Sequence, residues 1–125
     1  MNIERNSVCW FEIYVDVMER AKAFYESVLQ VKLDKVPVDE PEMWMFPGDP
    51  QKPGSSGALV KMSFKKPSKD GTVIYFSCED CANETSRVEE NGGKIFQNKF
   101  SIGEFGFISV IEDTEGNMVG FHSLK

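Results

Sequence analysis

Alternation of apolar and polar side chains marks the beginning of the chain as a strand. Residues 8–15, VCWFEIYV, are rich in β-branched and aromatic side chains, and successive side chains of a strand point to opposite faces. One face of this strand is wholly apolar, and the other carries Trp10, Glu12 and Tyr14. The mixed composition of the second face predicts that it lines something other than plain core.

A helical spacing of apolar residues follows the first strand. Apolar side chains recur at intervals of three and four from Ala21 to Val28, which predicts a helix that ends at about Leu29. Asp16 and Glu19 are three residues apart and resemble a capping box. The helix is therefore predicted to begin at Asp16.

The remaining elements form a pattern that occurs twice. Three strands are predicted after the first helix, at residues 31–38, 42–46 and 57–64. The second half repeats the order, with strands predicted at residues 72–78, 94–100, 105–112 and 117–123 and a helix at 82–91 closed by Gly92 and Gly93. A repeat of this length indicates two copies of one supersecondary unit.

This duplication predicts an α+β fold of two tandem βαβββ modules. Module one covers about residues 8–64 and module two about 72–123, within a single domain of residues 1–125. Each module must bury one sheet face under its helix, which leaves the opposite faces free to curve toward each other. We therefore expect a cupped mixed sheet with the helices on its outer face and a cleft on its inner face.

Composition narrows the partners and the compartment. The 125 residues carry 14 Lys and Arg against 20 Asp and Glu, a formal charge of -6. This acidity, with no basic block, argues against nucleic-acid binding. No apolar run is long enough to span a membrane, and the N-terminus lacks the pattern of a signal peptide. An odd number of cysteines, 3, fits a reducing compartment, so we expect a cytoplasmic protein without a membrane partner.

Three stretches of the sequence resemble a known family. These are FEIYVDVMERAKAFYESVL, CEDCANETSRVEENGGKIF and GFISVIEDTEGNMVGFHS, which with the duplicated order cover nearly the whole chain. They resemble the vicinal oxygen chelate superfamily, which includes glyoxalase I, bleomycin-resistance proteins and extradiol dioxygenases. The resemblance implies paired βαβββ modules, commonly in homodimers. Family members include lyases, isomerases and dioxygenases, so whether this chain is an enzyme stays open.

The resemblance also implies where a divalent metal would bind, because family enzymes hold it with His, Glu or Gln side chains of the first and last strands of each module. Those positions fall here on Trp10, Val73 and Gly120, and the strand at 57–64 contains no Asp, Glu, His or Cys. These residue types do not suit a metal. His122 is the single histidine, which excludes a site with two imidazoles in one chain. We therefore expect no metal and no cofactor, with a divalent metal kept as an alternative.

The candidate ligand-binding cleft combines the inward positions of both modules. Glu12 and His122 are the candidate catalytic residues, because a carboxylate and an imidazole in one cavity could orient a substrate or move a proton. The alternative is that His122 is a half-exposed strand end and that Glu12 is paired or solvated. The predicted cleft residues are Trp10, Glu12, Tyr14, Trp44, Val73, Tyr75, Gly120 and His122.

The motif Cys78-Glu79-Asp80-Cys81 stands where a strand turns into a helix. A CxxC motif at a helix start can exchange disulfides or contribute to a zinc site. The two acids between the cysteines would raise the pKa of the thiols, which favours structural cysteines instead. The role of this pair stays open.

The leading hypothesis from the sequence is a small-molecule binding protein of the glyoxalase and bleomycin-resistance type, without a metal, that sequesters or senses an apolar or aromatic compound. The first alternative is a lyase or isomerase of the glyoxalase type that uses Glu12 and His122, with or without a divalent metal. The second alternative is a purely structural dimer or partner module. Pairing of the modules within one chain or across a homodimer is also left open, because both occur in the family.

Overall fold

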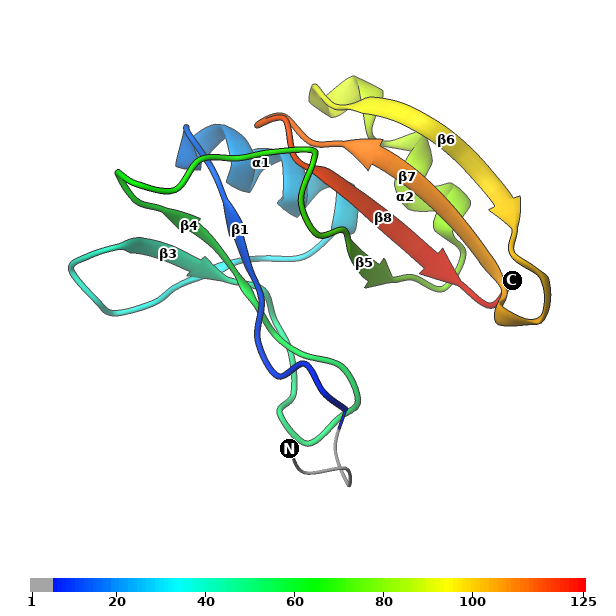
Figure 1. Ribbon diagram of the computed structural model, residues 1–125, viewed down its shortest axis with the longest axis horizontal. Helices are drawn as coiled ribbons and strands as arrows, with labels where there is room; N and C mark the ends of the chain where they lie inside the picture. Colours follow the sequence, from blue (N-terminus) through cyan, green and yellow to red (C-terminus); the bar gives the residue numbers. More distant parts are fainter. Residues whose placement is uncertain (1–5) are drawn as a thin grey trace.

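The duplicated βαβββ order is the main feature of the computed structural model, which describes residues 6–125 (Figure 1). Module one consists of β1 (Glu12–Tyr14), α1 (Met18–Leu29), β2 (Asp34–Lys35), β3 (Glu42–Met45) and β4 (Ala58–Lys61). Module two consists of β5 (Ile74–Ser77), α2 (Cys81–Ser86), the 3-10 turn η1 (Glu89–Asn91), β6 (Lys94–Ser101), the 3-10 turn η2 (Gly103–Phe105), β7 (Phe107–Glu112) and β8 (Met118–Ser123). The predicted α+β fold of two such modules is confirmed.

Each module forms its own four-stranded mixed sheet. The strand orders are β1-β4-β3-β2 and β5-β8-β7-β6, so the first strand of each module lies at an edge beside the last. The β1–β4 and β5–β8 pairs are parallel, and the other pairs are antiparallel. Figure 1 shows α1 and α2 on the same side of the two sheets, so the opposite faces carry no helix.

The start of α1 differs from the prediction. Asp16 does not cap the helix: the N-cap is Val17, whose side chain makes no capping hydrogen bond. The backbone N–H groups of Asp16 and Val17 donate instead to Oε1 of Glu115, at 2.9 and 2.8 Å. A carboxylate of module two therefore holds the two residues that precede the helix.

The second helix is shorter than predicted. It ends at Ser86, and the chain continues through the 3-10 turn η1 to Gly92, which has a φ of 95°. The Oγ1 atom of Thr85 donates to the carbonyl oxygen of Cys81 at 2.7 Å, a side-chain bond that competes with the regular helix. Asp80 caps the start of α2 by accepting from the N–H of Ala82 at 3.0 Å.

One hydrophobic core joins the two modules. The ring of Phe76 in β5 lies 5.9 Å from that of Tyr25 in α1 and 5.3 Å from that of Phe46, measured between centroids. Phe11 lies 6.0 Å from Phe76 with its ring nearly perpendicular, an arrangement that aromatic pairs favour. In this structure the modules thus pack against each other within the chain, through their helix-covered sides.

The turn between β7 and β8 ties module two to module one. Tyr25 Oη donates to Oδ2 of Asp113 at 2.6 Å, and both side chains are buried. Asn117 donates from Nδ2 to the carbonyl oxygen of Tyr14 at 2.9 Å and accepts at Oδ1 from the N–H of Ser68 at 2.8 Å. The predicted hairpin turn is present, and its polar side chains hold β1, α1 and the linker in place.

Candidate functional site

The faces without helices carry most of the predicted cleft residues. In the first sheet, Glu12 lies beside Ala58 and Tyr14 beside Val60, and all four side chains belong to the open face. Ile13 lies between them on the other face and is buried against α1. The open face of module one is therefore the face that the alternation of residues 8–15 predicted to be mixed.

Trp10, Glu12 and Tyr14 form one hydrogen-bonded group on this open face. Tyr14 Oη donates to Oε1 of Glu12 at 2.9 Å, and Trp10 Nε1 donates to Oε2 at 3.3 Å. The hydrogen bond to Glu12 is the main cause that raises the pKa of Tyr14. Trp10 is 39 % exposed, so its ring is accessible. The carboxylate is oriented by two aromatic donors, one on each side along the strand.

Trp44 does not join this group, although it was predicted to line the same cleft. Its register partner is Leu59, a buried residue of the helix-covered face. The ammonium of Lys22 in α1 lies 3.2 Å from the centroid of the Trp44 ring, and Trp44 Nε1 donates to Glu42 at 3.1 Å. The pairing register of β3 places Trp44 on the face opposite Glu12.

In the second sheet, Tyr75 and Gly120 are paired on the open face. A Cβ atom on Gly120 would lie 2.3 Å from Cε1 of Tyr75, so the ring packs directly over Gly120 and would have to move for any larger residue. Tyr75 is 47 % exposed. Val73, another predicted cleft residue, precedes β5 and is half-buried.

His122 also lies on this open face, opposite Ser77 in β5. Its Nε2 lies 2.6 Å from the carbonyl oxygen of Phe105 in η2. Because a carbonyl only accepts, Nε2 carries the proton, and Nδ1 holds the basic lone pair when the ring is neutral. His122 thus fixes the η2 segment and keeps one nitrogen for a ligand or a proton.

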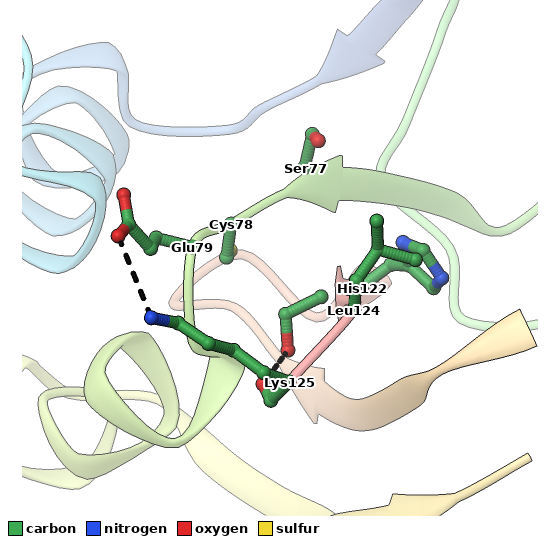
Figure 2. A pocket seen from close by; sticks show the side chains of 7 residues that line it. Ser77, Cys78, Glu79, His122, Leu124 and Lys125 are labelled. Atoms are coloured by element: carbon green, nitrogen blue, oxygen red, sulfur yellow. Dashed lines mark hydrogen bonds and ion pairs between the residues drawn. The ribbon is translucent and has the colours of Figure 1, made fainter.

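A shallow cavity of about 370 Å³ lies at the ends of β5 and β8 (Figure 2). Figure 2 shows the side chain of His122 on one side of this cavity and the ion pair of Lys125 with Glu79, at 3.8 Å, on the other. The lining residues are Ser77, Cys78, Glu79, His122, Ser123, Leu124 and Lys125. The cavity borders the open face of module two and does not reach Glu12.

The two candidate catalytic residues therefore lie on different sheets and share no hydrogen-bond partner. Glu12 belongs to the first sheet and contacts Trp10 and Tyr14, whereas His122 belongs to the second sheet and contacts η2. Within residues 6–125, no three His, Cys, Asp or Glu side chains gather into a group that could hold a metal ion. The arrangement favours binding through exposed rings and single polar groups.

The CxxC cysteines are poor candidates for chemistry. Burial raises the pKa of the Cys78 thiol to about 12, and Glu84 acts in the same direction. Cys81 is completely buried, whereas Cys9 is exposed. A thiol with so high a pKa is protonated at neutral pH and is a weak nucleophile.

The fold, its duplication and the open sheet faces define the class of protein. The family model Glyoxalase/Bleomycin resistance protein/Dioxygenase superfamily matches residues 7–121, and the chain belongs to this superfamily. The resemblance seen in the sequence is confirmed. The chain matches none of the curated protein sequences with which it was compared.

Solved structures share the fold at low identity. The antibiotic binding protein TnmS3 from Streptomyces sp. CB03234 is 20% identical, with a TM-score of 0.72 and 98% of each chain covered. A glyoxalase/bleomycin resistance protein from Albidiferax ferrireducens T118 is 16% identical, with a TM-score of 0.67 over 93% of this chain and 98% of the other. Glyoxalase I from Zea mays is 20% identical, with a TM-score of 0.72, and the match covers 93% of this chain and 45% of the maize chain. At these identities the likeness shows the fold alone.

Two structural features had no signal in the sequence or only a weak one. The contact of Glu115 with the start of α1 joins residues 98 and 99 positions apart, and no local pattern indicates it. The contact of His122 with η2 depends on the path of a loop with glycines between aromatic residues.

Across the described residues, no helix has the length and apolar character needed to cross a membrane.

Proposed function

We propose that this chain binds a small apolar or aromatic molecule on the open faces of its two sheets, without a metal, and thereby sequesters or senses it. The observation that carries the proposal is the pair of exposed rings, Trp10, which donates to Glu12, and Tyr75, which lies on the same sheet face as His122. Ligand sites commonly combine apolar and aromatic surface with a few placed polar groups. The antibiotic binding protein TnmS3, which shares the fold, supports a binding role.

We also propose that the protein acts in the cytoplasm as a homodimer. The odd number of cysteines, 3, which fits a reducing compartment, supports the cytoplasmic location. Membership of a superfamily whose members are commonly dimers supports the homodimer. Light scattering after size-exclusion chromatography tests the dimer: a mass of one chain at micromolar concentration contradicts it.

Thermal-shift measurements with a panel of aromatic compounds test the binding function. A compound present at 100 times its Kd stabilises the folded protein by about 2.7 kcal/mol, which is easily measured as a rise in Tm. Trp10→Ala or Tyr75→Ala should abolish the rise. Trp44→Phe, on the opposite face of the first sheet, is the matched control and should leave it unchanged.

The same experiment separates binding from the enzyme alternative. Addition of Ni²⁺, Zn²⁺ or Mn²⁺ should leave Tm unchanged. A saturable stabilisation by one of these metals that Glu12→Gln or His122→Ala removes would contradict the metal-free proposal and favour a glyoxalase-type lyase or isomerase. A panel whose binders are all unaffected by Trp10→Ala and Tyr75→Ala would contradict the proposed location of the site.

A further inference from the structure

The Glu12 carboxylate has two properties that point to the charge of the ligand. It accepts one hydrogen bond at each oxygen, from Tyr14 Oη and from Trp10 Nε1, and both donors are neutral. A carboxylate offers about four acceptor positions, so about two stay available. Of the charged nitrogens in residues 6–125, none lies within ion-pair distance of Glu12. An exposed negative charge is thus oriented but not neutralised by the described part of the chain.

The two donors add aromatic surface on both sides of this charge. In an extended strand, residues two apart lie on the same face about 7 Å from each other, so Trp10 and Tyr14 flank Glu12. The faces of Trp and Tyr rings attract cations, Trp most strongly. The ammonium of Lys65 already lies 5.9 Å from the centroid of the Tyr14 ring, which shows that a cation is accommodated at this end of the group.

We propose that the group of Trp10, Glu12 and Tyr14 binds the positively charged end of an organic ammonium compound. The inference rests on the proposed binding function and specifies the ligand further: an apolar or aromatic body with an amine or quaternary ammonium group. The ammonium contacts Glu12 at its remaining acceptor positions, and the body extends over the neighbouring open face. The side chains that reach the surface there are apolar: Met43 is half-buried and Met45 is 36% exposed, and they are the register partners of the fully buried Val60 and Ala58.

The charge of the whole chain favours the same class of ligand. A formal charge of -6 attracts cations from solution and repels anions. Lys65 carries the same charge as the proposed ligand and lies near the Tyr14 ring, where it competes with a ligand ammonium. Its removal should therefore tighten binding of a cation, whereas it would weaken or not change binding of an anion or a neutral compound.

The test uses a pair of probes that differ mainly in charge: 2-phenylethyltrimethylammonium and the neutral 2-phenylethanol. The indole N–H resonances of the two tryptophans report binding by NMR, because Trp10 belongs to the site and Trp44 lies on the opposite face. The ammonium probe should shift the Trp10 resonance saturably and bind about fivefold or more tighter than the alcohol. The Trp44 resonance should not move.

Variants separate the charge effect from simple aromatic contact. Glu12→Gln should remove the preference for the cation, so that both probes bind about equally. Lys65→Met should increase the affinity for the ammonium probe. Glu19→Gln, at an exposed position of α1, is the charge-matched control and should change neither. An unchanged Trp44 resonance verifies that each variant is folded. Equal binding of both probes, or a preference that persists in Glu12→Gln, overturns the inference but leaves the proposed binding function standing. No response of Trp10 to the ammonium probe overturns the inference as well, and the thermal-shift panel then decides the binding function separately.

Discussion

Replacement of Glu115 with alanine is expected to destabilise the protein strongly, although this residue lies in a turn. Its side chain is 0% exposed and accepts from the backbone N–H groups of Asp16 and Val17 and from Thr114 Oγ1. It also pairs with the guanidinium of Arg20, at 2.6 Å from Nε and 3.0 Å from Nη2. Removal of the carboxylate leaves the backbone N–H groups of Asp16 and Val17, which immediately precede α1, without an acceptor.

The magnitude follows from these contacts. A hydrogen bond from a backbone N–H to a carboxylate contributes about 1.5 kcal/mol, so the two at the start of α1 give about 3 kcal/mol. The Arg20 side chain is 52% exposed, so its ion pair adds at most about 1 kcal/mol. Glu115→Ala should therefore lower the free energy of unfolding by about 3–4 kcal/mol, which is a large part of the about 5–15 kcal/mol typical of a domain.

The acid dependence gives a second readout. Burial acts to raise the pKa of Glu115, but the hydrogen bonds from Arg20, Val17 and the other donors outweigh it, and the pKa is lowered from its ordinary value. A lowered pKa means that the carboxylate stabilises the fold above its unfolded pKa of about 4.3 and loses this effect as the pH falls through the folded pKa. The destabilisation caused by Glu115→Gln should therefore become smaller as the pH falls from 5 to 3.

Urea denaturation monitored by circular dichroism measures both effects. Glu19→Gln is the matched control, because the Glu19 side chain is 82% exposed and lies 3.8 Å from Lys22, and its change should stay within about 0.5 kcal/mol. A loss of less than about 1 kcal/mol in Glu115→Ala at pH 7 would refute the reasoning that this carboxylate holds the segment before α1 across the module boundary.

Three further predictions concern the thiols, the open face and the buried turn. In the native protein a thiol reagent should modify exposed Cys9 quickly, half-buried Cys78 slowly because its raised pKa keeps the thiol protonated, and buried Cys81 only after denaturation; rapid modification of all three would contradict this order. Gly120→Ala should displace the ring of Tyr75, which a Cβ would approach to 2.3 Å, and should weaken aromatic ligands in the thermal-shift panel more than it lowers Tm. Tyr25→Phe should cost about 2 kcal/mol at pH 7 and about 1 kcal/mol near pH 3.5, because burial raises the pKa of Asp113 and a hydrogen bond to the ionised form is the stronger one; a cost that grows toward acid pH would have the wrong sign.

The order of elements was predictable from the sequence because it depends on local periodicity. Alternation in residues 8–15 correctly grouped Trp10, Glu12 and Tyr14 on one face, since successive side chains of a strand always point apart. The same rule could not place Trp44. The face on which a residue lies relative to another strand depends on the pairing register, and the register of β3 with β4 is set by long-range contacts.

The start of α1 shows why a local motif can mislead. Asp16 and Glu19 have the spacing of a capping box, but the helix begins only at Met18, and the N–H groups of Asp16 and Val17 just before it donate to Glu115. Asp16 and Glu115 are both carboxylates, so acceptor strength does not decide between them; the packing of the β7–β8 turn against module one places Glu115 at these N–H groups. A competing partner from a distant segment is invisible to any pattern read within one turn of helix.

The residues that carry the resemblance to the superfamily therefore need not be the residues that bind a ligand. In the turn between β7 and β8, Asp113 accepts a hydrogen bond from Tyr25, and Glu115 accepts one from the backbone just before α1. Asn117 bonds to the backbone of β1 and of the linker. Such a turn identifies the fold because it holds the two modules together. The side chains of the open faces do not hold the modules together. Differences in ligand between proteins of this fold should therefore arise from positions such as those of Trp10 and Tyr75.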